Sequence, residues 1–295
     1  MIILREIFDE YCWEKHKQVL TFDFHQIVGL KNFAHWNINH ASKPTPLHYH
    51  SDIVEIHCLA KGTRETTVGN NHYIITGNEL FITFPYELHQ TTASAESPCE
   101  FYGFQIDLKE KQSLLGLDAK YSRFLADMLT SLPNRHLKVT STGIHMLKKA
   151  FEGLQSKNTA RYYAGVQYLC CFLFELQNLK PVTEEEAHSD TPIQKVVSYI
   201  DGHFREELSL EQLADVSGYS LSRFKMKFRE EVGITPAEFL TRRRVEYAKQ
   251  QLELTSRPII DIAFDTGFSS SNYFCSVFKK YVYCSPLSYR RRFRT

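Results

Sequence analysis

Three histidines and a glutamate stand close together in the first third of this 295-residue sequence. His48 and His50 are two positions apart, so a β-strand would place both side chains on one face. Glu55 follows them, and His89 comes directly after Pro85-x-Glu87-Leu88. Imidazole and carboxylate groups together suit Zn, Fe, Mn or Ni. These side chains could therefore bind a divalent metal, hydrogen-bond an organic ligand, or stabilise the protein itself.

The segments around these residues alternate apolar and polar positions over short runs. Six such runs lie between residues 19 and 106: Val19–Phe24, Phe33–Ile38, Ile53–Leu59, His72–Thr76, Leu80–Phe84 and Phe101–Ile106. Turn signals separate them, at Gly29, Pro44 and Pro46, Gly62, Gly69-Asn70-Asn71, Gly77-Asn78 and Ser97-Pro98. Many short strands at this spacing predict a β-barrel or a β-sandwich.

The apolar period changes to about 3.6 from residue 118 onward, which predicts helices over 118–132, 142–154 and 159–179. The third helix repeats apolar residues in steps of four and three, as a coiled-coil seam does; they are Tyr162, Val166, Leu169, Leu173 and Leu176. The same spacing also fits a helix that packs on its own barrel. The polar, charged stretch that follows, residues 181–191, predicts a linker.

The last third of the chain contains one pattern twice. The first copy reads Leu210-x2-Leu213-Ala214-x3-Gly218-Tyr219-Ser220, then Phe224-x3-Phe228 and Thr235-Pro236. The second reads Ile259-x2-Ile262-Ala263-x3-Gly267-Phe268-Ser269, then Phe274-x3-Phe278 and Ser285-Pro286. Such self-similarity indicates an internal duplication.

Each copy has the features of a helix-turn-helix unit: a short apolar helix, a glycine turn, and a second helix with a buried Phe pair. Ser209 with Gln212, and Thr235 with Glu238, predict capping boxes. Residues 236–254 predict a helix of about 28 Å between the copies, at 1.5 Å per residue. Two second helices at that separation could enter successive major grooves, which repeat about every 34 Å.

The charge distribution agrees with DNA binding by this part of the chain. Residues 191–295 hold 17 Lys and Arg against 12 Asp and Glu, whereas residues 1–190 hold 18 against 22. The overall charge of +1 thus combines a basic C-terminal part with an acidic N-terminal part. Phosphate contacts require such a basic surface.

The duplicated pattern, with the closing Ser285-Pro286-x2-Tyr289-Arg290-Arg291, resembles the DNA-binding domain of AraC/XylS transcription regulators. His48-x-His50-x4-Glu55-x6-Gly62, Gly77 and Pro85-x-Glu87-Leu88-His89 resemble the two motifs of the cupin jelly roll, the sensor domain of this family. The resemblance implies an α+β protein with a cupin and helical dimerisation segment over 1–180. It also implies an all-α tandem helix-turn-helix domain over 192–295.

The resemblance also implies roles for individual residues. In metal-binding cupins the positions that match His48, His50, Glu55 and His89 hold one divalent ion. In other sensor cupins the same positions contact a small organic effector. Trp36 and Tyr102 are further lining candidates, and His57, Tyr86 and Phe104 are others; taken singly, each of them fits the core of the barrel better. Aromatic residues at a barrel mouth suit a carbohydrate. A metal is thus a possible cofactor, and no cofactor is certain.

In the DNA-binding half, side chains on the solvent face of each second helix match base-reading positions. They are Ser222, Lys225 and Met226 in the first unit and Ser271, Asn272 and Ser276 in the second, with Cys275 as an apolar contact. Basic residues nearby are expected to meet phosphates; they are Arg223, Arg229, Arg242, Lys279, Lys280 and Arg290, with Arg243, Arg244, Arg291 and Arg292 close by.

Three functions fit these patterns. The first is a sugar-responsive regulator, an activator that binds promoter DNA as a homodimer and contacts RNA polymerase. The second is a metal or redox sensor with the same DNA-binding half. The third is a metal-dependent cupin enzyme with a DNA-binding appendage, but no general base beyond the four ligands can be identified.

Composition and segment lengths favour a cytoplasmic protein. Acidic residues within the first ten positions argue against a signal peptide, and the longest apolar stretch, 169–176, is too short to span a bilayer. The seven cysteines form no C-x-x-C pair, so they are expected to be reduced.

Overall fold

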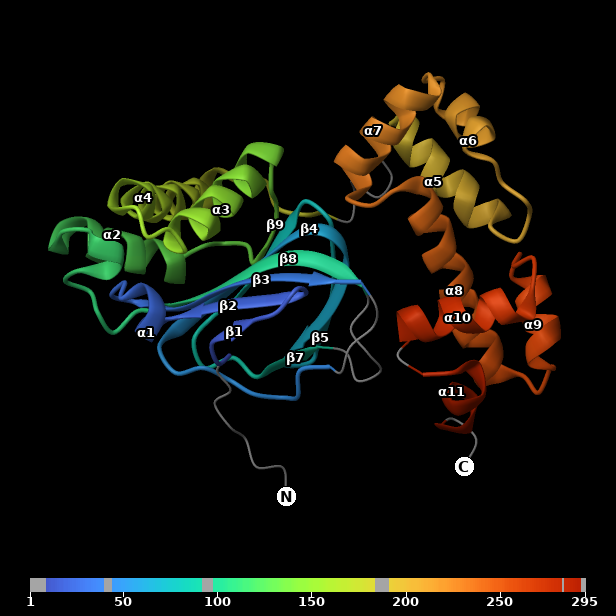
Figure 1. The fold of residues 1–295 in the computed structure, drawn as a ribbon, viewed down its shortest axis with the longest axis horizontal. Helices are drawn as coiled ribbons and strands as arrows, with labels where there is room; N and C mark the ends of the chain where they lie inside the picture. Colours follow the sequence, from blue (N-terminus) through green and yellow to red (C-terminus); the bar gives the residue numbers. More distant parts are fainter. Residues whose placement is uncertain (1–8, 40–43, 92–97, 184–190, 283, 293–295) are drawn as a thin grey trace. The chain divides into compact units, whose positions relative to one another are not determined.

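The computed structural model describes residues 9–39, 44–91, 98–183, 191–282 and 284–292. These divide into two compact units, with the first ending at Val182. The first unit holds the described strands and the helices α1 to α4, and the second holds α5 to α11 (Figure 1). The predicted fold class is thereby confirmed. Most of the predicted linker, residues 184–190, lies outside the described residues.

The described strands of the first unit are β1 Cys12–Trp13, β2 Lys17–Thr21, β3 Leu30–Ile38, β4 Ile53–Val68, β5 Asn71–Thr76, β6 Glu79–Thr83, β7 His89–Thr91, β8 Cys99–Asp107 and β9 His136–Lys138. They pair in the order β1-β2-β3-β8-β4-β6-β9, and β5 and β7 pair with β4 as well. The first half of β4 pairs with β8 and β6, and its second half with β5 and β7. One long strand therefore joins the main row of strands to β5 and β7.

Two predicted strand boundaries were wrong. The turn expected at Gly62 is instead the interior of β4, where the pairing with β8 shifts register between Leu59 and Lys61. A β-bulge lets the strand bend there without ending. The strand expected to reach Phe24 ends at Thr21, because residues Phe22–His25 form the short helix α1.

A layer of helices covers one face of the main sheet (Figure 1). These helices are α2 Ala119–Thr130, α3 Ser141–Leu154 and α4 Thr159–Glu175, with short 3-10 turns at Leu114–Gly116 and Leu176–Asn178. The apolar side chains of β3, β4 and β8 that face the helices form one core with them. Burial of this apolar surface is the main stabilisation of the unit.

The predicted coiled-coil seam on α4 belongs to this core. Val166, Leu169, Leu173 and Leu176 are all buried in it, and Tyr162 packs against its edge. The interpretation as a dimer seam was therefore wrong, and the alternative, a helix packed on its own barrel, is what the structure shows. A dimer contact stays a prediction and would have to use other residues.

His25 in α1 is buried in this unit, with 2% of its surface exposed. Its Nδ1 accepts a hydrogen bond from the Ile27 amide at 3.1 Å, and burial lowers the pKa of His25 to about 4. The unfolded chain binds a proton near the ordinary His pKa of about 6.5, whereas the folded protein does not until about pH 4. Stability is therefore lost as the pH falls between these two values.

We predict that His25 alone lowers the free energy of unfolding by about 2 kcal/mol between pH 7 and pH 5. The His25→Asn variant keeps an acceptor for the Ile27 amide but cannot titrate, so it should lose this part of the pH dependence. Urea unfolding of both proteins at the two pH values measures the difference. Equal pH dependence in the two proteins would contradict the assignment.

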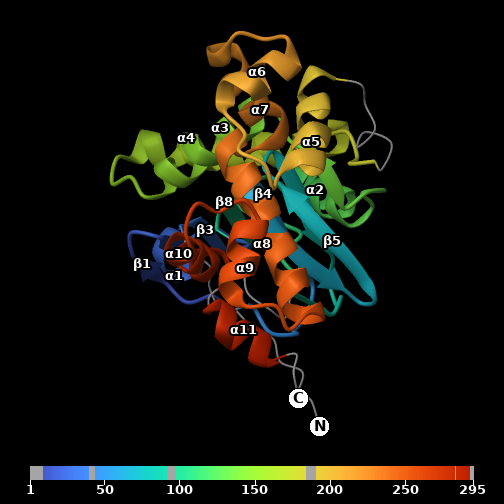
Figure 2. The same cartoon turned by 90° about the vertical axis from the view of Figure 1, so that its right-hand side faces the viewer.

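The helices of the second unit are α5 Pro192–His203, α6 Leu210–Ser217, α7 Leu221–Val232, α8 Pro236–Leu254, α9 Ile259–Asp265, α10 Ser271–Val282 and α11 Pro286–Arg292. Figure 2 shows α5, α6 and α7 around the first part of α8, and α9, α10 and α11 around its other end. Each group has its own apolar core, containing one of the two predicted Phe pairs. The helices α6 with α7 and α9 with α10 are the two predicted helix-turn-helix units.

Local signals in the sequence account for the ends of these helices. Ser209 and Gln212 form a complete capping box at α6. Thr235 caps α8 through the amide of Glu238, but the Glu238 carboxylate pairs with Arg242 instead of completing a second box. Gly218 ends α6 with a φ of 68°, a backbone conformation that glycine adopts without strain.

Arg244, on the middle turn of α8, connects the segment between α5 and α6 with the turn of the second helix-turn-helix unit. Its guanidinium donates to the carbonyls of Phe204 at 2.7 Å and Glu206 at 2.8 Å, just after α5. It also lies over the ring of Phe268, in the turn between α9 and α10. Gly267 has no side chain, and a Cβ there would lie 2.7 Å from the Arg205 carbonyl oxygen. Arg244 thus holds the segment after α5 and the turn between α9 and α10 against the same helix.

Candidate ligand site and nucleic-acid interface

The strands β4 and β8 alternate between two environments. Val54, Ile56 and Phe104 face the helices, whereas Glu55 and Gln105 lie on the opposite face, inside the barrel. This alternation is the period of two of a β-strand. It places the candidate ligand site on the barrel face of the sheet.

Some predicted lining residues lie elsewhere. Tyr102 and Phe104 are buried on the helix-facing side, so the prediction that they line the ligand site was wrong. Tyr86 is 60% exposed and donates to Asp52 at 2.8 Å. Trp36 is half-buried on the barrel side, where its ring stacks on Phe101 at 5.7 Å.

His48 and His89 are brought together by the backbone. Their amides and carbonyls form a reciprocal pair of hydrogen bonds at 3.0 and 2.9 Å, which leaves their ring centroids 4.1 Å apart. The Nδ1 of His48 donates to the Pro46 carbonyl at 2.8 Å, and that of His89 to the Glu87 carbonyl at 2.9 Å. These bonds fix the tautomer and leave each Nε2 as the basic nitrogen, as second-shell carbonyls do in metal sites.

A salt bridge secures the loop that carries His89. Arg135 binds the Glu87 carboxylate through both terminal nitrogens, at 2.8 and 2.7 Å. The same carboxylate accepts from the Phe84 amide at 2.8 Å. Because the Glu87 carbonyl orients the His89 ring, this bidentate pair helps to hold His89 in place.

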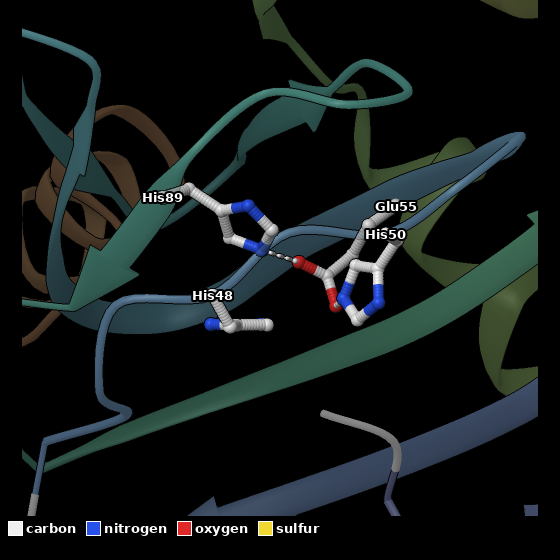
Figure 3. A group of neighbouring side chains, drawn as sticks. All are labelled: His48, His50, Glu55 and His89. Atoms are coloured by element: carbon white, nitrogen blue, oxygen red, sulfur yellow. Dashed lines mark ion pairs between the residues drawn. The ribbon is translucent and has the colours of Figure 1, made fainter. Parts of the chain in front are cut away.

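Glu55 occupies the centre of the cluster (Figure 3). One carboxylate oxygen lies 3.1 Å from His89 Nε2, and the other lies 3.6 Å from His50 Nε2. Burial alone would raise the pKa of Glu55, but His57 and His89 hold it well below its usual range. Burial opposes the positive charge of His89, yet Glu55 and the Glu87 carbonyl raise its pKa. The cluster therefore contains an ionised carboxylate among imidazoles.

The four side chains fit a divalent cation. One donor atom from each of His48, His50, Glu55 and His89 lies within 4.8 Å of the other three, and all four residues are buried. Three imidazole nitrogens and one carboxylate oxygen suit a borderline transition metal. When bound, such an ion would be a Lewis acid. The same donors could bind hydroxyl groups of an organic ligand, with His57 beside them.

Two residues of this region were missed by the sequence-based argument. Gln105 and Asn32 are each 4% exposed, and the Gln105 amide contacts both Glu55 and His50. A signal was present, because Gln105 is the one polar residue between Phe104 and Ile106 in an apolar run. Its meaning was hidden, because the partner strand's register cannot be read from the sequence.

The first recognition helix, α7, presents its predicted readers to solvent. Ser222, Lys225 and Met226 are exposed, and Phe224 and Phe228 are buried below them. Arg223 and Arg229 are exposed on the same helix, with Arg223 over the ring of Tyr219 at 4.7 Å. The face contains the hydrogen-bonding, apolar and cationic groups that base and phosphate contacts use.

The second recognition helix, α10, resembles the first in this arrangement. Asn272 and Ser276 are exposed, Ser271 is half-buried, and Lys279 and Lys280 are exposed near the end of the helix. Cys275 is half-buried against the core of the unit, so its contact is at least partly internal. Tyr273, 56% exposed between the predicted readers, was missed.

Two of the predicted phosphate contacts are engaged inside the unit. The Arg242 guanidinium pairs with Glu238 at 2.8 Å, and 12% of its side chain is exposed. Arg290 is half-buried and donates to the Arg257 carbonyl at 2.6 Å. Arg244 is bound to backbone carbonyls, as described above. These arginines stabilise the unit, so the exposed Lys279, Lys280 and Arg229 are better placed to meet phosphates.

Two family models match the chain. A model described as an AraC-like ligand binding domain matches residues 39–161, and one described as a helix-turn-helix domain matches residues 213–292. Among the described residues, no helix has both the length and the apolar character needed to cross a membrane.

Curated relatives are HTH-type transcriptional regulators. The uncharacterized regulator YdiP of Escherichia coli (strain K12) is 26% identical over 262 residues, covering 84% of this chain and 81% of that protein. The uncharacterized regulator SAS0078 of Staphylococcus aureus (strain MSSA476) is 33% identical over 158 residues. That match covers 51% of this chain but 21% of the staphylococcal protein.

Solved structures also match. The DNA-binding domain of AdpA in complex with a target DNA is 28% identical, with 36% of this chain and 95% of that chain covered and a TM-score of 0.35. ToxT from Vibrio cholerae O395 is 13% identical, with 95% and 99% covered and a TM-score of 0.36.

A sheet-rich ligand-binding domain followed by two helix-turn-helix units defines a DNA-binding transcription regulator with its own sensor domain. The chain belongs to the AraC family of these regulators, as the sequence motifs predicted.

Proposed function

We propose that this regulator changes its binding to promoter DNA when a small effector enters the barrel beside His48, His50, Glu55 and His89. The observation that carries this proposal is the buried cluster of polar side chains on the barrel face. The same chain continues from this domain into the two helix-turn-helix units. Buried polar groups are costly unless they have partners, so a cluster of this size is expected to serve a ligand.

The finer assignment is an activator that acts as a homodimer, contacts RNA polymerase and responds to a carbohydrate. The imidazoles and the carboxylate of the cluster support the sugar, since sugar hydroxyl groups bind to convergent polar groups.

The test is DNA binding by the full chain, measured by fluorescence anisotropy with DNA from upstream of its own gene. Affinity should fall steeply with salt, and a sugar that raises the thermal midpoint of the protein should change it. If no salt-dependent binding occurs, the DNA-binding part of the proposal fails. If binding occurs but no sugar changes it, only the effector class fails.

The second candidate is a metal-responsive regulator. The donor set of the cluster favours it, because the Nδ1 bonds of His48 and His89 direct each Nε2 into the cluster, where that of His89 lies 3.1 Å from the Glu55 carboxylate. DNA affinity would then depend on the concentration of free metal ion.

We predict that the purified protein binds about one equivalent of Zn²⁺ and that His48→Ala weakens this binding at least about a hundredfold, since second-shell losses alone cost ten- to a hundredfold. Elemental analysis and a chelator competition measure the two quantities. His72→Ala is the matched control, because His72 is exposed on β5 outside the cluster. Equal losses in both variants would contradict a site at His48.

A further inference from the structure

Asn32 and Gln105 form a buried amide pair behind the histidine cluster. They are register partners on β3 and β8, and each is 4% exposed. The Asn32 amide nitrogen donates to the Gln105 carbonyl oxygen at 2.9 Å. That bond directs the NH2 group of Gln105 toward the cluster.

The charge of Glu55 confirms this orientation of the Gln105 amide. The NH2 group of Gln105 lies 2.8 Å from a Glu55 carboxylate oxygen. If the amide were reversed, its carbonyl oxygen would face an ionised carboxylate, and neither group could donate a hydrogen. The pair Asn32 and Gln105 therefore has one favourable arrangement.

The same NH2 group lies 3.1 Å from His50 Nε2. His50 Nε2 does not donate to Glu55, because the distance between this nitrogen and the nearer Glu55 carboxylate oxygen is 3.6 Å, too long for a hydrogen bond. His50 Nε2 thus accepts from Gln105. An imidazole nitrogen has one lone pair, which either accepts a hydrogen bond or coordinates a metal ion.

His50 differs in this respect from the other two histidines of the cluster. Backbone carbonyls accept from Nδ1 of His48 and His89, so the Nε2 of His48 is left for a ligand, and the Nε2 of His89 faces only the Glu55 carboxylate, 3.1 Å away, which would bind the same ion. At His50, by contrast, the Gln105 amide donates a hydrogen bond to Nε2, the nitrogen that faces Glu55. A carboxylate has several lone pairs, so the bond from Gln105 to Glu55 does not compete in the same way.

We propose that Gln105, oriented by Asn32, competes with a divalent cation for His50 and so weakens metal binding at the cluster. The proposal rests on the metal-responsive candidate described above. A weakened, reversible site suits a sensor, because its occupancy then follows the free ion concentration. Gln105 is a positioning residue that acts through His50 and Glu55.

The experiment titrates Zn²⁺ against a chromophoric chelator with the full chain and its Gln105→Met and Gln105→Leu variants. Both variants remove the competing donor but keep most of the side-chain volume. We expect each to bind Zn²⁺ about three- to tenfold more tightly, the equivalent of roughly one hydrogen bond. Gln18→Met is the control, since Gln18 is half-buried on β2, away from the cluster.

The outcomes separate this proposal from the one on which it rests. If the variants bind Zn²⁺ more tightly than the unmodified protein, or bind it when the unmodified protein does not, the result supports competition by Gln105. Equal or weaker binding by the variants overturns it while leaving the metal-responsive function intact. No binding by any of the proteins overturns both, whereas salt-dependent DNA binding by the same samples would still support the regulator. Two replacements of different shape keep the test valid if one of them does not fold.

Discussion

Gly165→Val is expected to lower the free energy of unfolding of the first unit by about 3 kcal/mol, the upper end of the usual cost of overpacking. A Cβ on Gly165 in α4 would lie 2.9 Å from the Gly153 Cα and 3.0 Å from the Ala150 carbonyl oxygen in α3. These are backbone atoms, which cannot rotate away as a side chain can. The two helices would have to separate, and the core residues between them would lose contacts.

Ala164→Val is the matched control, because Ala164 is exposed one residue earlier on the same helix. It should cost only a few tenths of a kcal/mol, the difference in helix propensity. Urea unfolding followed by tryptophan fluorescence measures both, since the only tryptophans, Trp13 and Trp36, lie in the first unit. Equal destabilisation by the two variants would show that the close helix crossing does not matter.

Asn272→Ala and Lys279→Ala should weaken DNA binding in two different ways. Asn272 is exposed near the start of α10, where a side chain can pair with adenine. Its loss should cost about 1–3 kcal/mol, or about five- to 150-fold, on the preferred sequence and little on other DNA. Lys279 is exposed two turns later. Its loss should weaken binding to all sequences and reduce the salt slope by about one.

Anisotropy titrations at several salt concentrations, with operator DNA and with unrelated DNA, measure both effects. Lys249→Ala is a control for a lost charge, because Lys249 pairs with Glu246 on α8. If Asn272→Ala weakened binding to both DNAs equally, Asn272 would contact the backbone and not a base. If Lys279→Ala left the salt slope unchanged, its phosphate role would be refuted.

The helical half of the protein could be predicted from sequence almost to the residue. The helix expected over 236–254 is α8, Pro236–Leu254, because Thr235 and Pro236 define its start locally. The Phe pairs of α7 and α10 are buried as their spacing indicated. Such signals depend on residues three or four positions apart, so no distant part of the chain is needed to interpret them.

The barrel was less predictable, since its details depend on pairing between distant strands. Gly62 has the composition of a turn, yet β4 continues through it because β8 pairs on both sides of the bulge. Tyr102 was assigned to the ligand side, although its side chain faces the helices. A strand's alternation tells which residues share a face but not which face is the interior.

The candidate ligand site shows the same limit. The spacing of His48 and His50, with the cupin resemblance, led to the four residues whose donor atoms the structure brings within 4.8 Å. Asn32 and Gln105 are 73 positions apart, and only the register of β3 with β8 joins them. Their part in the site could not have been found without the structure.

The connection made by Arg244 has a consequence for the promoter. Because α8 is one uninterrupted helix of 19 residues and Arg244 binds both the segment between α5 and α6 and the turn of the second helix-turn-helix unit, the separation of the two readers is not adjustable. The two DNA segments that α7 and α10 contact must then lie about ten base pairs apart on one side of the duplex. Five additional base pairs between these two segments would turn one of them to the opposite side of the duplex, where its recognition helix could not contact it. Target genes would therefore be selected by spacing as much as by sequence.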